Sequence, residues 1–163
     1  MALDLVRIDD RLIHGQVVVG WGQPLGIGFF ILVDDEVAQS DWEQELYRMG
    51  VPPEMDIYFD SVASAARRLP GYRADRRVGM LLTGDIETME RLIALAPGIR
   101  SVTVGGIHHK PGRVARLRYV FLTGEEERRL WALWTAGVRV TAQDVPSAAP
   151  VPLEEMLSGD GSG

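Results

Sequence analysis

The sequence predicts an α/β protein with a doubly wound, mostly parallel sheet of about seven strands and helices on both faces. Short runs rich in Val, Ile, Leu and Phe alternate with stretches in which apolar residues recur every three or four positions. Continuous apolar runs are typical of parallel strands covered on both sides, and their alternation with helices is typical of βαβ units. A length of 163 residues suits one domain with a sizeable core.

Seven apolar runs are predicted as strands of this sheet. In chain order they are Leu3–Ile8, Phe29–Val33, Met55–Phe59, Val78–Leu82, Ser101–Val104, Arg118–Phe121 and Val138–Ala142. Helical patterns lie between most neighbouring runs, so we expect crossover connections rather than hairpins.

Helix boundaries are marked by capping and stop signals. The clearest helix follows Thr123-Gly124-Glu125-Glu126, which matches a capping box, and Gly137 is expected to close it. Pro70-Gly71 is expected to stop an earlier helix after Leu69. A further helix is predicted to begin around His14, directly after the first strand. The other helical patterns cover residues 36–49, 61–69 and 85–96.

The tryptophans are predicted to lie mostly in the core. Trp42 is separated by helical packing intervals from Leu46 and Met49, and Trp131 and Trp134 lie on the helix that follows Thr123. We expect these side chains to be packed against the sheet. Trp21 is also expected in the core.

Composition excludes several classes of function. A net charge of −6 argues against a nucleic-acid partner, whose phosphates require clustered Lys and Arg. The absence of cysteine excludes disulfides and thiolate metal sites. The first residues do not resemble a signal peptide, and no run approaches the ~18 apolar residues of a membrane span, so a cytoplasmic protein is expected.

The domain organisation is predicted to be simple. Residues 1–145 are expected to form a single α/β domain. Residues 146–163 carry Pro146, Pro150 and Pro152 and end in a Gly- and Ser-containing stretch. We expect this C-terminal extension to be partly flexible.

The segment richest in chemistry is Arg7-Ile8-Asp9-Asp10-Arg11-Leu12-Ile13-His14-Gly15-Gln16-Val17, referred to below as the histidine motif. It follows the first strand, and open α/β sheets bind ligands at the carboxyl ends of their strands. A histidine with an unperturbed pKa near ~6.5 can carry a phosphoryl group, and a guanidinium can hold phosphate oxygens with paired donors. We therefore interpret His14 as a phosphoryl carrier and Arg11 as its phosphate stabiliser.

Other residues are assigned supporting roles. Asp9 or Asp10 can orient the imidazole, and the sequence does not choose between them. The backbone N–H groups of Gly15 and Gln16, at the start of the next helix, can face the phosphate. Thr83 either reaches the phosphate or caps a helix.

Several of these residues also have a purely structural interpretation. Gly105 and Gly106 either shape the opposite wall of the site or form an ordinary turn. Taken alone, His14 can be a packed or capping residue, and its acidic and basic neighbours a solvated turn. Two adjacent histidines, His108 and His109, suggest a metal site, but neighbouring side chains of an extended segment point apart and no third ligand has useful spacing. We therefore predict neither metal nor cofactor.

The histidine motif resembles the signature of the IIB components of the mannose/fructose/sorbose class of the bacterial sugar phosphotransferase system. Asp34-Asp35-Glu36-Val37-Ala38 is similar to the acidic stretch after that family's second strand, and Ser101 to His108 is similar to its Val-Gly-Gly-Met stretch. The resemblance extends through Val145 and implies the same doubly wound fold.

The resemblance implies a phosphotransferase that relays phosphate. His14 would accept it from a phosphohistidine of a IIA protein or domain and transfer it to a sugar bound by membrane IIC/IID partners. The protein would then be cytoplasmic and transiently associated with the inner face of the membrane, and a homodimer is compatible with the family.

Two alternatives remain open at this point. The chain can be a regulatory IIB-like module, whose phosphorylation state controls a partner without sugar transport. It can also be an α/β small-molecule binder in which His14 is inert.

Overall fold

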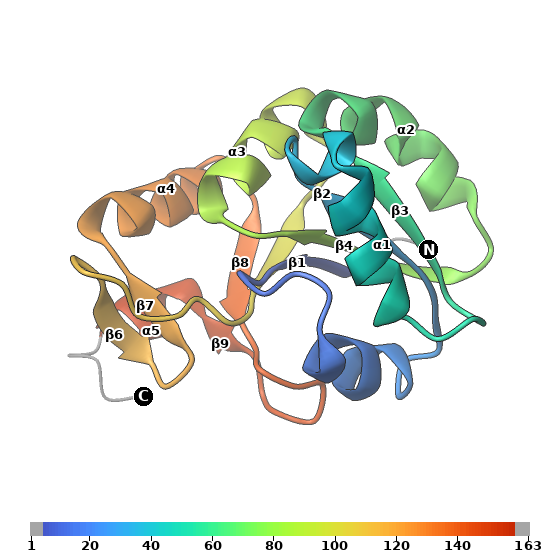
Figure 1. The fold of residues 1–163 in the computed structure, drawn as a ribbon. Coiled ribbons are helices and arrows are strands. Elements are labelled where there is room, and N and C mark those ends of the chain that lie inside the picture. Colours follow the sequence, from blue (N-terminus) through green and yellow to red (C-terminus); the bar gives the residue numbers. More distant parts are fainter. Residues whose placement is uncertain (1–4, 159–163) are drawn as a thin grey trace.

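A seven-stranded sheet forms the centre of the molecule in a computed structural model that describes residues 5–158. The strand order is β3-β2-β4-β1-β5-β8-β9, and all pairs are parallel except the antiparallel β8–β9 pair (Figure 1). The α/β class and mostly parallel sheet are confirmed. The strands are β1 (Leu5–Ile8), β2 (Ile27–Val33), β3 (Asp56–Asp60), β4 (Val78–Thr83), β5 (Ser101–Val104), β8 (Arg139–Ala142) and β9 (Val151–Pro152).

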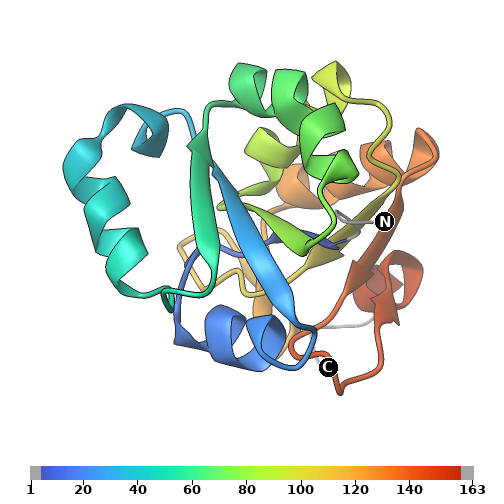
Figure 2. The same ribbon diagram turned by 90° about the vertical axis from the view of Figure 1, so that its right-hand side faces the viewer.

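Helices cover both faces of the sheet (Figure 2). Side chains of one strand alternate between two cores, because successive residues of a strand point to opposite faces. In β2, Phe29 and Ile31 belong to the core shared with α2, α3, α4 and α5, whereas Phe30 belongs to the core under η1. The helices are η1 (a π-helix, Gln16–Gly22), η2 (3-10, Val37–Gln39), α1 (Asp41–Met49), α2 (Val62–Ala74), α3 (Ile86–Leu95), α4 (Gly124–Thr135) and α5 (Leu153–Ser158).

The carboxyl end of β1 lies where the connections between strands change from one face of the sheet to the other. The segment after β1 enters η1 on one face, while the helices reached from its neighbours β4 and β5 lie on the other face. Such a switch point leaves a crevice between diverging loops and is the usual ligand site of open α/β sheets. The fold therefore places the histidine motif where a binding site is expected.

One predicted strand lies outside the main sheet. Arg118–Phe121 was expected in the central sheet, but β7 (Val120–Leu122) pairs antiparallel with β6 (Val114–Leu117) in a separate hairpin. An apolar run indicates a strand without indicating its partner, and here the partner precedes it by two residues. The seventh place in the sheet is taken by β9, where Pro152 is tolerated because the strand is at the edge.

The predicted stop at Pro70 was wrong, because α2 continues to Ala74. Proline removes one backbone hydrogen bond, and side-chain contacts beyond it compensate. The Tyr72 hydroxyl donates to Asp60 Oδ2 at 2.6 Å, and its ring lies 6.1 Å from that of Phe29. Tertiary packing thus holds the last turn of the helix.

Helix α1 differs from the prediction in its packing. The segment divides into η2 and α1, and Trp42, Leu46 and Met49 are exposed rather than packed, with Trp42 67% exposed. The helix is instead attached by Gln44, whose amide donates to the carbonyls of Val37 and Ala38. Regular apolar spacing therefore indicated the helix correctly but not the face that is buried.

The other tryptophans give a mixed result. Trp21 is buried as expected, whereas Trp134 is 45% exposed and only its half-buried neighbour Trp131 packs against the core. The two rings meet edge to face at 5.4 Å. The capping box at Thr123 is present, and Gly137 has the positive φ of a helix-closing glycine.

The C-terminal segment joins the main fold over its described part. Strand β9 pairs with β8, and Leu153 and Met156 of α5 are buried in the core shared with α2, α3 and α4. The predicted flexibility of the final residues falls on 159–163, outside the described residues.

The packing of the β2–β4 pair gives a stability prediction. A Cβ at Gly79 would lie 2.3 Å from Cζ of Phe29, whereas a Cβ at Gly71 in α2 would meet nothing within 4 Å. We expect Gly79→Ala to destabilise the protein by ~1–3 kcal/mol through overpacking. Gly71→Ala should instead stabilise it by ~0.5–1 kcal/mol, because alanine favours a helix interior. Urea unfolding of both variants tests this, and equal stabilities would contradict it.

Candidate functional site

The histidine motif is tied to both strands that flank β1. The N–H of Asp9 donates to Thr83 O of β4, and the N–H of Asp10 donates to Gly106 O beyond β5, each at 2.9 Å. A turn then reverses the chain, closed by the N–H of Leu12 donating to Asp9 O. Leu12 has φ +56, a conformation that costs a non-glycine residue roughly 1–3 kcal/mol and is concentrated at functional sites. The backbone is thus constrained two residues before His14.

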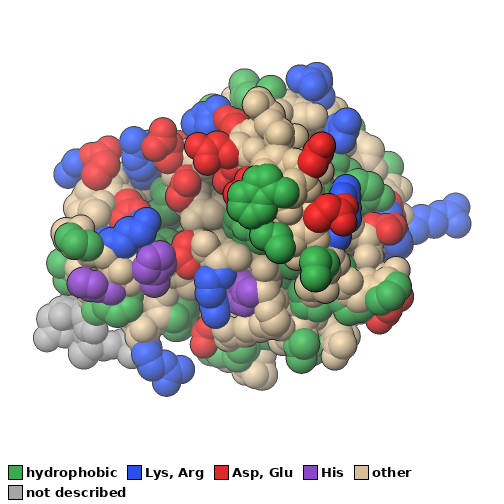
Figure 3. Space-filling view, in the orientation of Figure 1, with side chains coloured by type: hydrophobic (Ala, Val, Ile, Leu, Met, Phe, Trp, Pro, Cys, Tyr) green, Lys and Arg blue, Asp and Glu red, His purple; other side chains and the backbone are tan. Residues whose placement is uncertain are grey.

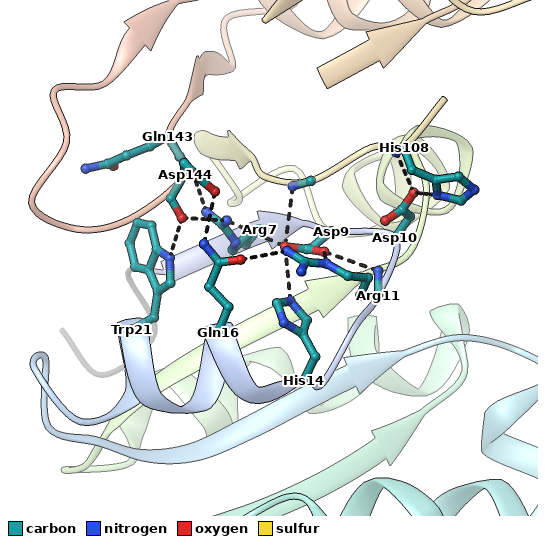
Figure 4. Close-up of polar contacts among 11 residues, drawn as sticks. Arg7, Asp9, Asp10, Arg11, His14, Gln16, Trp21, His108, Gln143 and Asp144 are labelled. Atoms are coloured by element: carbon teal, nitrogen blue, oxygen red, sulfur yellow. Dashed lines mark hydrogen bonds and ion pairs between the residues drawn. The ribbon is translucent and has the colours of Figure 1, made fainter. Parts of the chain in front are cut away.

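Asp9 is the centre of the site (Figure 4). Its side chain is fully buried, and its Oδ2 lies 3.4 Å from Nε2 of His14 and 3.5 Å from Nη2 of Arg7. The other carboxylate oxygen, Oδ1, accepts the backbone N–H of Arg11 at 3.2 Å. Asp9 therefore contacts the His14 imidazole, whereas Asp10 contacts His108.

Arg7 supplies the buried positive charge next to Asp9. It donates to Gln143 O at 2.7 Å and Asp144 O at 3.2 Å, and its guanidinium lies 4.6 Å from the centre of the Trp21 ring. A Cβ at Gly105 would lie 2.4 Å from Arg7 Nη2, so glycine is required for the guanidinium to fit. Gly105 therefore contributes to the site by leaving room for the Arg7 guanidinium.

Electrostatics keep Asp9 ionised. Burial acts to raise the pKa of Asp9, but the contacts with His14 and the backbone N–H of Arg11, together with the charge of Arg7, outweigh it and hold the pKa below its usual value. Burial also lowers the pKa of Arg7, against the opposing charge of Asp9. Asp9 therefore stays ionised, and its carboxylate provides a negative charge beside the imidazole.

His14 lies at the edge of this charge network. Its side chain is 15% exposed, and Nε2 is buried without a well-formed hydrogen bond in residues 5–158. At 3.4 Å the contact with Asp9 is longer than a typical hydrogen bond. The helix expected around His14 begins at Gln16. The ring is therefore neither enclosed in the apolar core nor fully solvated.

Arg11 lies above the carboxylate and is half exposed. Its Nε is 3.5 Å from Asp9 Oδ1, and its Nη2 donates to Gln16 Oε1 at 3.0 Å. Gln16 in turn donates from Nε2 to Asp144 Oδ1 at 3.2 Å. Gln16 thus enters the site through its side chain, while the predicted use of its backbone N–H and that of Gly15 stays a prediction.

Two further predicted residues take positions of their own. Gly106 lies over the carboxylate, and its N–H donates to Asp9 Oδ2 at 3.4 Å. Thr83 is fully buried and its hydroxyl donates to Asp85 O, while Asp85 itself caps α3. Thr83 therefore contributes its backbone carbonyl to the motif, and its hydroxyl is already engaged.

A hollow lies beside Arg11. It has a volume of about 530 Å³ and lies between the histidine motif and the β6–β7 hairpin. At its rim the backbone N–H of His108 donates to Asp10 Oδ2 at 2.8 Å, and the His108 ring contacts the same oxygen. Figure 3 shows histidine side chains and basic side chains gathered on this face, next to a hydrophobic area.

Sequence reasoning did not assign roles to Arg7, Trp21 or Asp144. The available signal was Arg7 itself, a charged residue inside the apolar run of β1, which a strand buried on both faces accepts only with a partner. Asp144 and Trp21 gave no such signal, because their contacts to Arg7 use a backbone carbonyl and a ring face.

Two findings bear on ligands and membranes. Within residues 5–158, no group of three or more His, Asp or Glu side chains is arranged to hold a metal ion. In the same range no helix has the length and apolar character needed to cross a bilayer.

The buried Arg7–Asp9 pair predicts that removing the charge of Asp9 strongly destabilises the protein. Asp9→Asn leaves Arg7 buried without its counter-charge, and breaking such a pair costs ~3–5 kcal/mol. Asp10→Asn is the matched control, because its partner His108 is exposed and the expected cost is below ~1 kcal/mol. Chemical denaturation at pH 7 measures both, and equal effects would contradict the role of Asp9.

The lowered pKa of Asp9 also predicts that the protein loses stability in acid. Because the pKa of Asp9 is lowered in the folded state, its stabilisation is complete above the unfolded value of ~3.9 and is lost as the pH falls through the folded value. We expect Asp9→Asn to lose less stability than the parent as the pH falls from about 5 to about 2. Parallel acid limbs would argue against this linkage.

Comparison with known proteins identifies the family. Residues 3–162 match the model of the PTS system sorbose subfamily IIB component. The N-acetylgalactosamine-specific phosphotransferase enzyme IIB component 1 of Escherichia coli K12 is 31% identical over 145 residues, covering 87% of this chain and 90% of that protein. The mannose-specific EIIAB component of the same organism is 30% identical over 160 residues, and this chain spans 49% of its length.

A solved structure agrees with these relatives. The IIBSor domain of the sorbose permease from Klebsiella pneumoniae superposes with a TM-score of 0.85 at 25% identity, over 97% of each chain. The sequence match and the shared fold extend across the histidine motif and the sheet alike. The chain belongs to the sorbose-subfamily IIB components of the phosphotransferase system.

Proposed function

We propose that this chain is a phosphoryl carrier, which accepts phosphate on His14 from a IIA phosphohistidine and transfers it to a sugar held by membrane IIC/IID components. The single observation that supports this most strongly is the Arg7–Asp9–His14 arrangement. A buried, ionised carboxylate faces one nitrogen of a partly exposed imidazole, with a half-exposed guanidinium above it.

The geometry favours Nδ1 as the phosphorylated atom. Nε2 faces Asp9 and is buried. A proton on Nε2 can then be held by the carboxylate, which leaves the lone pair of Nδ1 for attack on phosphorus. Asp9 therefore selects the tautomer and stabilises positive charge on the ring, as an orienting carboxylate does in other histidine catalysts.

The phosphoryl group is transferred in two steps, first to His14 and then to the sugar. In the first, the N–P bond of the donor phosphohistidine breaks as the bond to Nδ1 forms, with the phosphoryl group passing in line between two rings. In the second, the Nδ1–P bond breaks and an O–P bond to the sugar forms, while the hydroxyl proton goes to the released imidazole. Arg11 can neutralise charge on the phosphoryl oxygens in both steps.

Partners and location follow from this role. A relative named as a mannose-specific EIIAB component carries a matching region in about half its length, which supports a IIA-type donor for this chain. A relay between such a donor and IIC/IID would work in the cytoplasm, in transient contact with the inner face of the membrane.

His14→Ala should abolish phosphoryl acceptance. We expect the parent, incubated with phosphoenolpyruvate and the upstream relay proteins, to gain one phosphoryl group that mild acid removes, and the variant to gain none. A double variant, His108→Ala with His109→Ala, should still gain it. Intact-mass measurement reads out all three proteins, and full labelling of His14→Ala would rule out the assignment.

Arg11→Lys should slow transfer while leaving the fold intact. Loss of the planar pair of donors removes a charge-assisted interaction of ~1.5–3 kcal/mol, which corresponds to a slowing of roughly 10- to 150-fold. Arg48→Lys on α1 is the matched control, since Arg48 is exposed, pairs with Glu45 and lies over the ring of Phe59. Rapid-quench labelling compares the rates, and identical rates for both variants would remove the role of Arg11.

A further inference from the structure

We infer that the hollow beside Arg11 is a binding site for a neutral polyhydroxy ligand, a free hexose or hexosamine derivative. The inference rests on the proposed function only for the identity of that ligand as the phosphoryl acceptor. It would give this chain a direct part in holding the sugar, in addition to carrying the phosphate.

The hollow has the size and rigidity of a ligand site. Its volume of about 530 Å³ lies within the ~300–1,000 Å³ of small-molecule pockets. The hairpin that forms one wall is fixed to the segment after β5, because Ile107 N–H donates to Tyr119 O and Phe121 N–H donates to Ile107 O, each at 2.9 Å. The cavity is therefore built by the fold rather than by mobile side chains alone.

Its charges are balanced. Two guanidinium groups, Arg11 and Arg118, line it together with two carboxylates, Asp10 and Asp144. A site for an anion would carry an excess of positive charge, whereas equal numbers of both signs suit hydroxyl groups, which donate and accept. The charge pattern thus favours a neutral polar ligand.

Several of these groups have hydrogen-bonding capacity left. Arg118 forms no hydrogen bond or ion pair with any residue of the described range. Asp144 accepts Gln16 through Oδ1, and no bond to its Oδ2 occurs among residues 5–158. Donors and acceptors are therefore both available to a ligand that is itself rich in hydroxyls.

Aromatic side chains supply the apolar part of the wall. Tyr119 and Phe121 line the hollow, and the His109 ring meets Phe121 edge to face at 5.6 Å. A pyranose or furanose ring has C–H faces that pack on such surfaces while its hydroxyls remain hydrogen-bonded. A small polar ion would leave this wall unused.

The hollow is connected to the phosphoryl site. Arg11 and Gln16 line it, and they are joined to each other at 3.0 Å directly above Asp9, which contacts His14. A sugar hydroxyl at this end of the cavity would lie beside the phosphoryl group carried by His14. The site would thus orient the accepting hydroxyl for the second transfer.

Saturation-transfer NMR with the isolated, unphosphorylated protein tests the inference. The probes are fructose, mannose, sorbose and N-acetylgalactosamine, each compared with mannose 6-phosphate and with inorganic phosphate. We expect the signals of at least one neutral sugar to show saturation transfer. Amide correlation spectra of the ¹⁵N-labelled protein with that sugar should show shifts of the backbone resonances of Tyr119 and Phe121. Arg118→Ala should weaken that binding roughly tenfold, the loss expected for one charged hydrogen-bond partner. Arg139→Ala, at an exposed position at the start of β8, should bind like the parent.

Three outcomes would overturn the inference. Absence of binding by every neutral sugar, or binding of the phosphate compounds alone, would show that the hollow is not a polyol site. Equal affinity in Arg118→Ala and the parent would place the sugar elsewhere. Phosphoryl acceptance by His14 is measured separately, so labelling without sugar binding refutes this inference alone, and sugar binding without labelling refutes only the carrier role.

Discussion

The buried contact between Arg7 and Asp9 is the interaction on which the rest of the site depends. A carboxylate without access to water stays ionised only if its charge is compensated, and Arg7 provides that charge from within β1. The requirement extends to Gly105, which leaves room for the guanidinium, and to Trp21, whose ring covers it. The imidazole of His14 can therefore face a fixed negative charge at the surface end of the same network.

The sheet determines where this network meets solvent. Strand β1 lies between β4 and β5, and the helices reached from these three strands diverge to opposite faces. The crevice at this switch point leaves the His14 ring partly exposed while Asp9 beside it stays buried, and η1 and the β6–β7 hairpin form its walls. A carrier that must present one group to two partners in succession benefits from such a site, because the charge is buried while the reacting atom remains within reach.

The fold class and the position of the histidine motif after the first strand could be predicted from the sequence, because both depend on local patterns. Apolar runs of strand length and a capping box such as that at Thr123 are read directly from neighbouring residues. Pairing partners and buried faces depend on distant contacts, so the β6–β7 hairpin, the exposed face of α1 and the continuation of α2 past Pro70 were missed. For the site, the motif predicted His14 and its neighbours, but only the three-dimensional structure shows that Asp9 contacts the His14 ring and that Asp10 contacts His108.

The central claim is that Asp9 holds one imidazole nitrogen so that the other carries the phosphoryl group. Heteronuclear NMR of the ¹⁵N-labelled protein, phosphorylated through its relay partners, measures this directly, because the phosphorus couples to the nitrogen to which it is bonded. We expect the coupling at Nδ1 of His14, with a proton retained on Nε2. Phosphorus bonded to Nε2, or to any other residue, would contradict the account.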